Sequence, residues 1–173
     1  MAAKAIKTKF VTDKVRFSFA HVFEPAETPS GAMKYSVSVL IPKSDKAGVD
    51  RFNAAFEKVK KDNPTFWGAA IPKTLKGGLR DGDEEREGDP VYAGHYFFNA
   101  NSGERPGVVD VDLNPITDKT EFYSGCYGRA SVTMYPYDQS GSKGIAFGLN
   151  NVMKLEDGEK LGGATSAAVD FAV

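Results

Sequence analysis

Strict alternation of side chains in the stretch GCYGRASVTMYPYD, from Gly125 to Asp138, limits this part of the chain to a β-strand. Successive side chains of a strand point to opposite sides of the sheet. One side is small and apolar, which is typical of a core: Cys126, Gly128, Ala130, Val132 and Met134. The other side combines aromatic rings, a cation and hydroxyls, and suits neither a dry interior nor an ordinary solvated surface: Tyr127, Arg129, Ser131, Thr133 and Tyr135.

The same alternation predicts five more strands. In KVRFSFAHVF it assigns Val15, Phe17 and Phe19 to the core side, and in MKYSVSVLIP it leaves a small, polar and basic outer side with Lys34 and Ser36. The remaining three segments are AGHYFFNANS, RPGVVDVDL and KGIAFGLNNVMKL, separated by turn-forming Gly, Pro, Asn and Ser. The segment 81–89 lacks alternation and has six acidic residues in nine positions, which predicts an exposed, mobile loop. Calcium binding is the alternative, but the order of ligands does not match an EF-hand loop.

One segment, SDKAGVDRFNAAFEKVKKDNP, changes to the period of an amphipathic helix. Its apolar residues follow the i, i+3, i+4, i+7 spacing: Val49, Phe52, Ala55, Phe56 and Val59. Ser44 or Asp45 is the expected N-cap, and Asn63 before Pro64 is the expected end. About six strands with one helix predict a mainly β OB-fold, a five- to six-stranded antiparallel barrel with long loops. Two packed sheets are the alternative.

The length of 173 residues suits one domain, which we place at residues 1–160, followed by a flexible Gly/Ala/Ser-rich tail at 161–173. No apolar run is long enough to span a membrane, and the first ten residues lack a hydrophobic signal core. The single cysteine, Cys126, agrees with a reducing compartment and is expected to be buried. These features predict a cytoplasmic protein without a membrane partner.

The distribution of charge is more informative than the net charge of −1. Residues 1–80 carry 15 Lys and Arg against 7 Asp and Glu, a balance of +8, and residues 81–173 carry 7 against 16, a balance of −9. A nucleic-acid-binding groove can lie within such a split, because the local field at the groove matters more than the sum. The alternative is that the two halves neutralise each other in the fold.

Motifs for catalysis are sparse. His21 and His95 lack metal-ligand spacing, and the sequence contains neither a nucleophile elbow nor a phosphate-binding glycine loop. Asp110 and Asp112 in VVDVDL, two residues apart on one expected strand, are the best enzyme hypothesis, a magnesium-dependent nuclease. A polar strand face explains the two carboxylates as well, so we expect no enzyme, no metal and no cofactor.

The outer strand faces together predict a stacking platform with cations beside it. Aromatic rings stack on unpaired bases for about 1–3 kcal/mol each, while Lys and Arg follow the phosphates. A duplex hides its base faces, so exposed rings favour single strands. The predicted platform consists of Arg16, Lys34, Ser36, Tyr127, Arg129, Ser131 and Tyr135, with Phe98 on a face that the pattern leaves ambiguous. A β domain that binds protein and no nucleic acid remains a further alternative.

Three segments resemble a bacteriophage family related to the T7-type single-stranded DNA-binding proteins with an OB-fold. These are KYSVSVLIPKSD at 34–45, FYSGCYGRASVTMYPYD at 122–138 and KGIAFGLNNVMKLEDGEKLGG at 143–163. The resemblance implies a protein that coats transient single strands without sequence preference in DNA replication, recombination and repair in the cytoplasm of the bacterial host. It also implies phage replication proteins as partners, and leaves the oligomeric state open, with a homodimer as one option.

The resemblance supports four of the predicted site residues, Lys34, Lys43, Tyr127 and Arg129. The basic loop residues Lys73, Lys76 and Arg80 extend the predicted site. Related replication proteins end in an acidic tail with a terminal aromatic, whereas SAAVDFAV offers only Asp170 and Phe171. Recruitment or dimerisation through the tail is therefore not implied here, and the acidic segment 81–89 becomes the candidate for competing with DNA.

Overall fold

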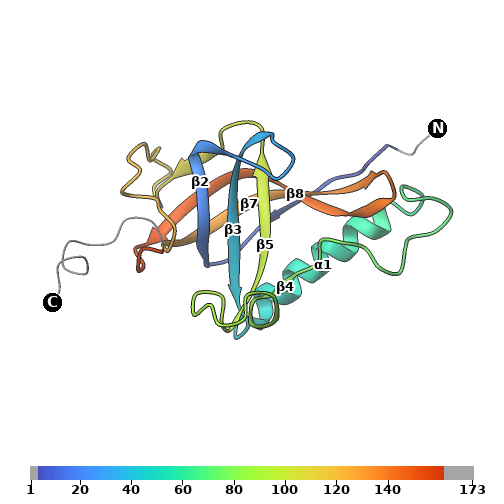
Figure 1. The fold of residues 1–173 in the computed structure, drawn as a ribbon, viewed down its shortest axis with the longest axis horizontal. Helices are drawn as coiled ribbons and strands as arrows, with labels where there is room; N and C mark the ends of the chain where they lie inside the picture. The colour runs from blue at the N-terminus through green and yellow to red at the C-terminus, as the bar shows by residue number, and fades with distance from the viewer. Residues whose placement is uncertain (1–3, 162–173) are drawn as a thin grey trace.

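The computed structural model describes residues 4–161 and is mainly β, with few helices (Figure 1). The strands are β1 (Thr8–Val11), β2 (Val15–Glu27), β3 (Met33–Pro42), β4 (Arg80–Asp81), β5 (His95–Ser102), β6 (Gly107–Val109), β7 (Tyr127–Gln139) and β8 (Ser142–Glu156). The helices are α1 (Lys46–Asp62) and the one-turn α2 (Gly82–Glu85). The expected tail lies outside the described residues, apart from Leu161.

Five strands pair in a closed ring, in the order β7, β2, β3, β5, β8 and back to β7. Within the ring β5 and β8 are parallel, and the other four pairings are antiparallel. The whole sheet has eight strands, so the expected count of five to six was too low. The two strands that were missed, β1 and β4, are four and two residues long, too short for alternation to be recognisable.

The inside of the ring holds the apolar faces that alternation predicted. The small face of β7 is buried as expected, with Ala130, Val132 and Met134 at most 1% exposed, and the Cys126 thiol before it is buried too. Helix α1 lies against the ring and inserts Phe52, whose ring centre is 5.1 Å from that of Phe98. Burying a phenylalanine of this kind stabilises the fold by about 1.5–3 kcal/mol, so α1 is part of the core.

Helix α1 begins and ends where its capping residues predict. The Asp45 carboxylate accepts a hydrogen bond from the Gly48 amide at 3.0 Å, which makes Asp45 the N-cap. Asn63 ends the helix, and its amide side chain donates to the Val59 carbonyl at 2.7 Å. Phe52, Phe56 and Val59 face the core, as their spacing indicated.

Strand β2 departs from strict alternation at Phe19. The register against β3 shifts between Ser18 and His21, which marks a β-bulge. Phe19 has a φ of +46°, a left-handed conformation that costs a bulky residue energy, and its side chain is 53% exposed. The expectation that Phe19 belongs to the core was therefore wrong. The bulge turns its side chain outward, and Val22 returns to the interior.

The acidic segment 81–89 is held against the fold, contrary to the expected mobile loop. The Lys43 ammonium donates to carboxylate oxygens of Asp81 and Asp83, both at 2.7 Å. The chain that follows buries Tyr92 in a second apolar cluster with Leu40 and Phe97, on the outer side of β3 and β5. Within residues 4–161, no helix has both the length and the apolar character needed to cross a bilayer.

Candidate functional site

The bulge in β2 lies where three surface cavities adjoin. Phe19 and His21 line two of them, on the two sides of the bulge, and His21 also lines the third. The Ala20 amide does not donate to the sheet, because its acceptor is the Ser124 hydroxyl at 2.9 Å. This contact with the 119–124 segment stabilises the bulge, which presents an exposed aromatic ring and an exposed imidazole side by side.

The first cavity, of about 310 Å³, lies over the outer face of β2 and β3. Its floor carries Ser36 and Ser38 from β3 and Asn99 from β5, the small polar side chains of the outer face. Small residues allow an extended ligand to lie close to the sheet, and their hydroxyl and amide groups provide hydrogen bonds without charge.

The second cavity, of about 490 Å³, lies between the bulge and the 86–92 segment. The guanidinium carbon of Arg86 lies 5.2 Å from the centre of the Phe19 ring and 4.6 Å from that of Tyr92. The Tyr92 hydroxyl donates to the Ser38 hydroxyl at 3.1 Å. Arg86 also pairs with Asp89 at 3.2 Å, and Tyr92 is buried, so the ring that a base can reach here is the exposed Phe19.

Asn99 connects the first cavity with a further one, of about 520 Å³, between β5 and the β7–β8 hairpin. Its lining includes Lys76, Arg80 and Tyr137. The Lys76 ammonium donates to the Ser142 hydroxyl at 3.1 Å, and Arg80 pairs with Glu85 at 3.0 Å. We call the cavities of about 310, 490 and 520 Å³ together the front groove. It extends from the bulge across β3 and β5 to the β7–β8 hairpin.

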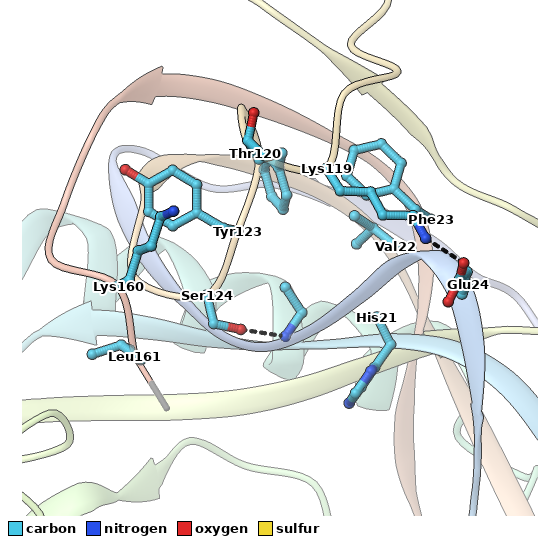
Figure 2. Close-up of a pocket in the computed structure, with 12 residues that line it drawn as sticks. His21, Val22, Phe23, Glu24, Lys119, Thr120, Tyr123, Ser124, Lys160 and Leu161 are labelled. Atoms are coloured by element: carbon cyan, nitrogen blue, oxygen red, sulfur yellow. Dashed lines mark hydrogen bonds and ion pairs between the residues drawn. The ribbon is translucent and has the colours of Figure 1, made fainter. Parts of the chain in front are cut away.

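The remaining cavity at the bulge lies outside the front groove, between β2 and the 119–124 segment (Figure 2). Its volume is about 380 Å³. Tyr123 and Lys160 lie on one side of it, and Phe23 and Lys119 on the other. Lys119 pairs with Glu24, and this cation lowers the pKa of the Glu24 carboxyl. Burial is the main cause that raises the pKa of the Tyr123 hydroxyl.

The predicted platform residues of β7 lie apart from the front groove. The Tyr127 ring is half-buried, with the Lys14 ammonium 5.2 Å and the Arg16 guanidinium carbon 5.4 Å from its centre. The chain at Gly158 packs against the same ring. Arg16 donates to the carbonyls of Gly125 and Glu159, so its charge is used within this corner of the fold.

Two other residues of this β7 face, Arg129 and Ser131, turn toward another depression, of about 300 Å³. Arg129 and Ser131 line it together with apolar side chains that include Leu113, and the Arg129 guanidinium donates to the Thr12 carbonyl at 2.9 Å. Tyr135 is half-buried, with the Lys7 ammonium 5.9 Å from its ring centre. The structure therefore does not bring the predicted residues of β7 into one channel with those of β3. The β7 residues are Tyr127, Arg129, Ser131 and Tyr135, and the β3 residues are Lys34 and Ser36.

The other predicted residues have different surroundings. Lys34 and Ser36 lie on β3, and Ser36 lines the front groove. Lys76 and Arg80 also line it, whereas Lys73 is an exposed loop residue outside the cavities named above. Lys43 is clamped by two carboxylates, which raise the pKa of its ammonium. Phe98 borders the cavity of about 520 Å³, but it is 1% exposed and packs in the core against Phe52 and Phe147, so we remove it from the predicted platform.

The nuclease alternative loses its geometric basis. Strand β6 ends at Val109, so Asp110 and Asp112 do not share a strand face as expected. One Asp110 carboxylate oxygen accepts the backbone amides of Asp112 and Asn114 at 2.9 and 3.0 Å, which makes Asp110 a turn residue. Among residues 4–161, no three His, Cys, Asp or Glu side chains lie close enough to hold a metal ion.

Sequence reasoning missed Phe19, Arg86 and Tyr92 as groove residues. Alternation placed Phe19 inside because a bulge of one residue inverts the faces without leaving a Gly or Pro in the sequence. Arg86 lies within an acidic run that indicated a solvated loop, so it was not predicted as a site residue.

Comparisons with known proteins point to one family. The sequence profile described as Enterobacter phage Enc34, ssDNA-binding protein, matches residues 8–173. Protein p50 of Acyrthosiphon pisum secondary endosymbiont phage 1 is 33% identical over 171 residues, covering 94% of this chain and 91% of p50.

Solved structures agree with this result. The single-stranded DNA-binding protein from bacteriophage Enc34 in complex with ssDNA has a TM-score of 0.76 at 26% identity, covering 89% of each chain. The single-stranded DNA-binding protein gp2.5 of bacteriophage T7 has a TM-score of 0.62 at 17% identity, covering 97% of this chain and 96% of gp2.5. The second likeness concerns the fold alone.

Proposed function

The chain belongs to the family of the Enterobacter phage Enc34 ssDNA-binding protein, and from this membership we propose that it binds single-stranded DNA without sequence preference and without catalysis. The relative of known structure that is 26% identical was solved with ssDNA bound. We propose that it coats transient single strands during phage DNA replication, recombination and repair. It would do so in the cytoplasm of the host, alongside phage replication proteins.

We assign the ring of five strands to an OB-fold barrel. The order of pairing, with β2, β3 and β5 consecutive and β8 returning to both β5 and β7, supports this assignment. OB-folds bind oligonucleotides on the face of their second and third strands and at the loops beside it. In this chain those strands are β3 and β5, whose outer face forms the floor of the front groove.

The single observation that carries the proposed site is Phe19, an exposed ring held in a strained conformation at the entrance to the front groove. Strained residues that the surrounding structure holds in place are concentrated at functional sites. We propose that an unpaired base stacks on Phe19. The backbone then crosses the serines of β3 and Asn99, and its phosphates reach Lys76 and Arg80 at the far end.

The groove favours a single strand over a duplex for two reasons. Stacking on Phe19 needs an open base face, which a duplex does not offer. The small side chains of the floor also let a flexible chain lie directly on the sheet, where hydrogen bonds to serine and asparagine do not depend on the order of bases. Lys34, at the β3 end of this face, remains part of the proposed phosphate track.

A gel shift with matched single-stranded and double-stranded oligonucleotides at two salt concentrations tests this proposal. We expect retardation of the single strand only, weakening as salt rises. Retardation of neither substrate contradicts the proposed function, and equal retardation of both contradicts the preference for single strands. Incubation with magnesium and labelled single strands should leave the DNA intact, since the proposal includes no catalysis.

A further inference from the structure

We infer that the cavity between β2 and the 119–124 segment binds one further nucleotide of the same DNA strand, beyond the front groove (Figure 2). The inference rests on the proposed function. It adds a subsite at the bulge end of the path, with a base between Tyr123 and Phe23 and a phosphate at Lys160.

The walls of this cavity have the chemistry that a nucleotide requires. Tyr123 and Phe23 line it from opposite sides, with Lys160 on the side of Tyr123 and Lys119 on the side of Phe23 (Figure 2). Aromatic rings bind the base face, and ammonium groups bind the phosphate. The volume of about 380 Å³ is at the lower end of the range for small-ligand sites, which suits one nucleotide rather than several.

Lys160 is the better phosphate ligand of the two lysines. Its ammonium lies 5.5 Å from the Tyr123 ring centre and has no carboxylate within 4.0 Å among the described residues. Lys119 is paired with Glu24, so a phosphate there competes with an existing partner. An ammonium group that has no carboxylate partner can bind a phosphate without first breaking an ion pair.

The hydroxyl of Ser124 adds a directed hydrogen bond. Its oxygen already accepts the Ala20 amide, which fixes its position, and its proton remains available to a phosphate or base oxygen. Thr120 lines the same wall, and its hydroxyl donates to the Asp118 carboxylate, so it is less available. Ser124 therefore supplies a polar contact beside the bulge.

The cavity is also continuous with the front groove. Ala20, His21, Ser124 and Leu161 line both this cavity and the one that contains Phe19 and Arg86. A strand whose base stacks on Phe19 can therefore pass over His21 and place its next nucleotide against Tyr123. The bulge that exposes Phe19 thus also opens the passage between the two cavities.

A length series of oligo-dT tests the subsite, because OB-folds take about 4–16 nucleotides and affinity stops rising once the site is full. We expect Lys160→Ala to leave the affinity for the shortest binding oligonucleotides unchanged. For longer ones the affinity should stop rising about one nucleotide earlier than in wild type, and the salt slope should fall by about 0.7. Lys14→Ala removes the same charge beside Tyr127, outside the cavity, and should match wild type at every length.

Photo-crosslinking with 5-iodouracil, moved one position at a time along the longest oligonucleotide, supplies evidence that does not depend on a variant. Crosslinks to Tyr123 or Phe23 are expected from one terminal position, next to positions that crosslink to Phe19. Identical length profiles for Lys160→Ala and wild type, or crosslinks to Phe19 without any to Tyr123 or Phe23, overturn the subsite and leave the proposed function intact. Loss of single-strand binding by wild type itself overturns both.

Discussion

The Arg86 guanidinium carbon lies 5.2 Å from the centre of the Phe19 ring, at a backbone position where Phe19 has a φ of +46°. A cation over a ring face contributes about 0.5–1 kcal/mol at an exposed site. A non-glycine residue in the left-handed region costs about 1–2 kcal/mol. The contact with Arg86 therefore offsets only part of the strain at the bulge, and the remainder favours a functional reason for the exposed ring.

Replacing Phe19 by glycine separates folding from DNA binding. Glycine adopts a positive φ freely, so Phe19→Gly should unfold at the same or a higher denaturant concentration than wild type. The same change should weaken binding to oligo-dT by about 1–3 kcal/mol, because one stacked base loses its platform. Urea unfolding and a fluorescence titration at fixed salt measure the two effects.

Leu113→Gly is the matched control for Phe19→Gly. Leu113 also has a positive φ, of +67°, and its side chain is 67% exposed, but it lines the depression beside β7 and β8. Its replacement should relieve backbone strain in the same way and leave DNA affinity unchanged. A loss of affinity in Leu113→Gly that equals the loss in Phe19→Gly argues against the front groove.

Phe98 is a core residue. Its ring centre lies 5.1 Å from that of Phe52 and 4.9 Å from that of Phe147. Phe98→Ala should therefore lower the free energy of unfolding by about 3–5 kcal/mol. Phe98→Leu, which retains most of the volume, should fold and bind oligo-dT as wild type does. Weakened binding by a stably folded Phe98→Leu returns this ring to the DNA site.

Lys76 tests the cationic end of the front groove. Its ammonium bonds to Ser142 and has no carboxylate within 4.0 Å among the described residues, so its charge is available to a phosphate. We expect Lys76→Ala to reduce the magnitude of the salt slope of binding by about 0.7, the value for one phosphate contact on a single strand. Lys58→Ala on α1, where Lys58 pairs with Asp62, should leave the slope unchanged. Equal slopes in all three proteins exclude Lys76 from the phosphate track.

The sequence predicted those parts of the fold that depend on local periodicity. Helix α1 ended at its caps, and the small face of β7 was buried, because both patterns continue without interruption over many residues. The family resemblance was also confirmed. Short strands such as β1 and β4 contain too few residues to show a period, so they were missed.

The site was harder to predict, because it depends on long-range relationships. Whether an alternating residue such as Tyr127 is accessible depends on the chain at Gly158 and on Lys14, which are distant in sequence. The bulge at Phe19 is fixed by Ser124, more than one hundred residues away. The sequence does not show that Lys43 is paired, because its partners Asp81 and Asp83 are distant in sequence and only the fold brings the three residues together.

The clamp around Lys43 predicts a pH-dependent stability. Its ammonium lowers the pKa of both Asp81 and Asp83, chiefly through direct hydrogen bonds. A carboxyl whose pKa is lower in the folded state stabilises the fold above its unfolded pKa of about 3.9, and that contribution is lost as the pH falls through the folded value. Lys43→Met should therefore melt at a lower temperature than wild type at pH 7, and the two melting temperatures should converge as the pH falls through the lowered pKa values of Asp81 and Asp83. Lys43→Arg keeps the cation and should retain the wild-type pH profile. A constant difference between Lys43→Met and wild type over this range shows instead that Lys43 stabilises the acidic segment by packing alone.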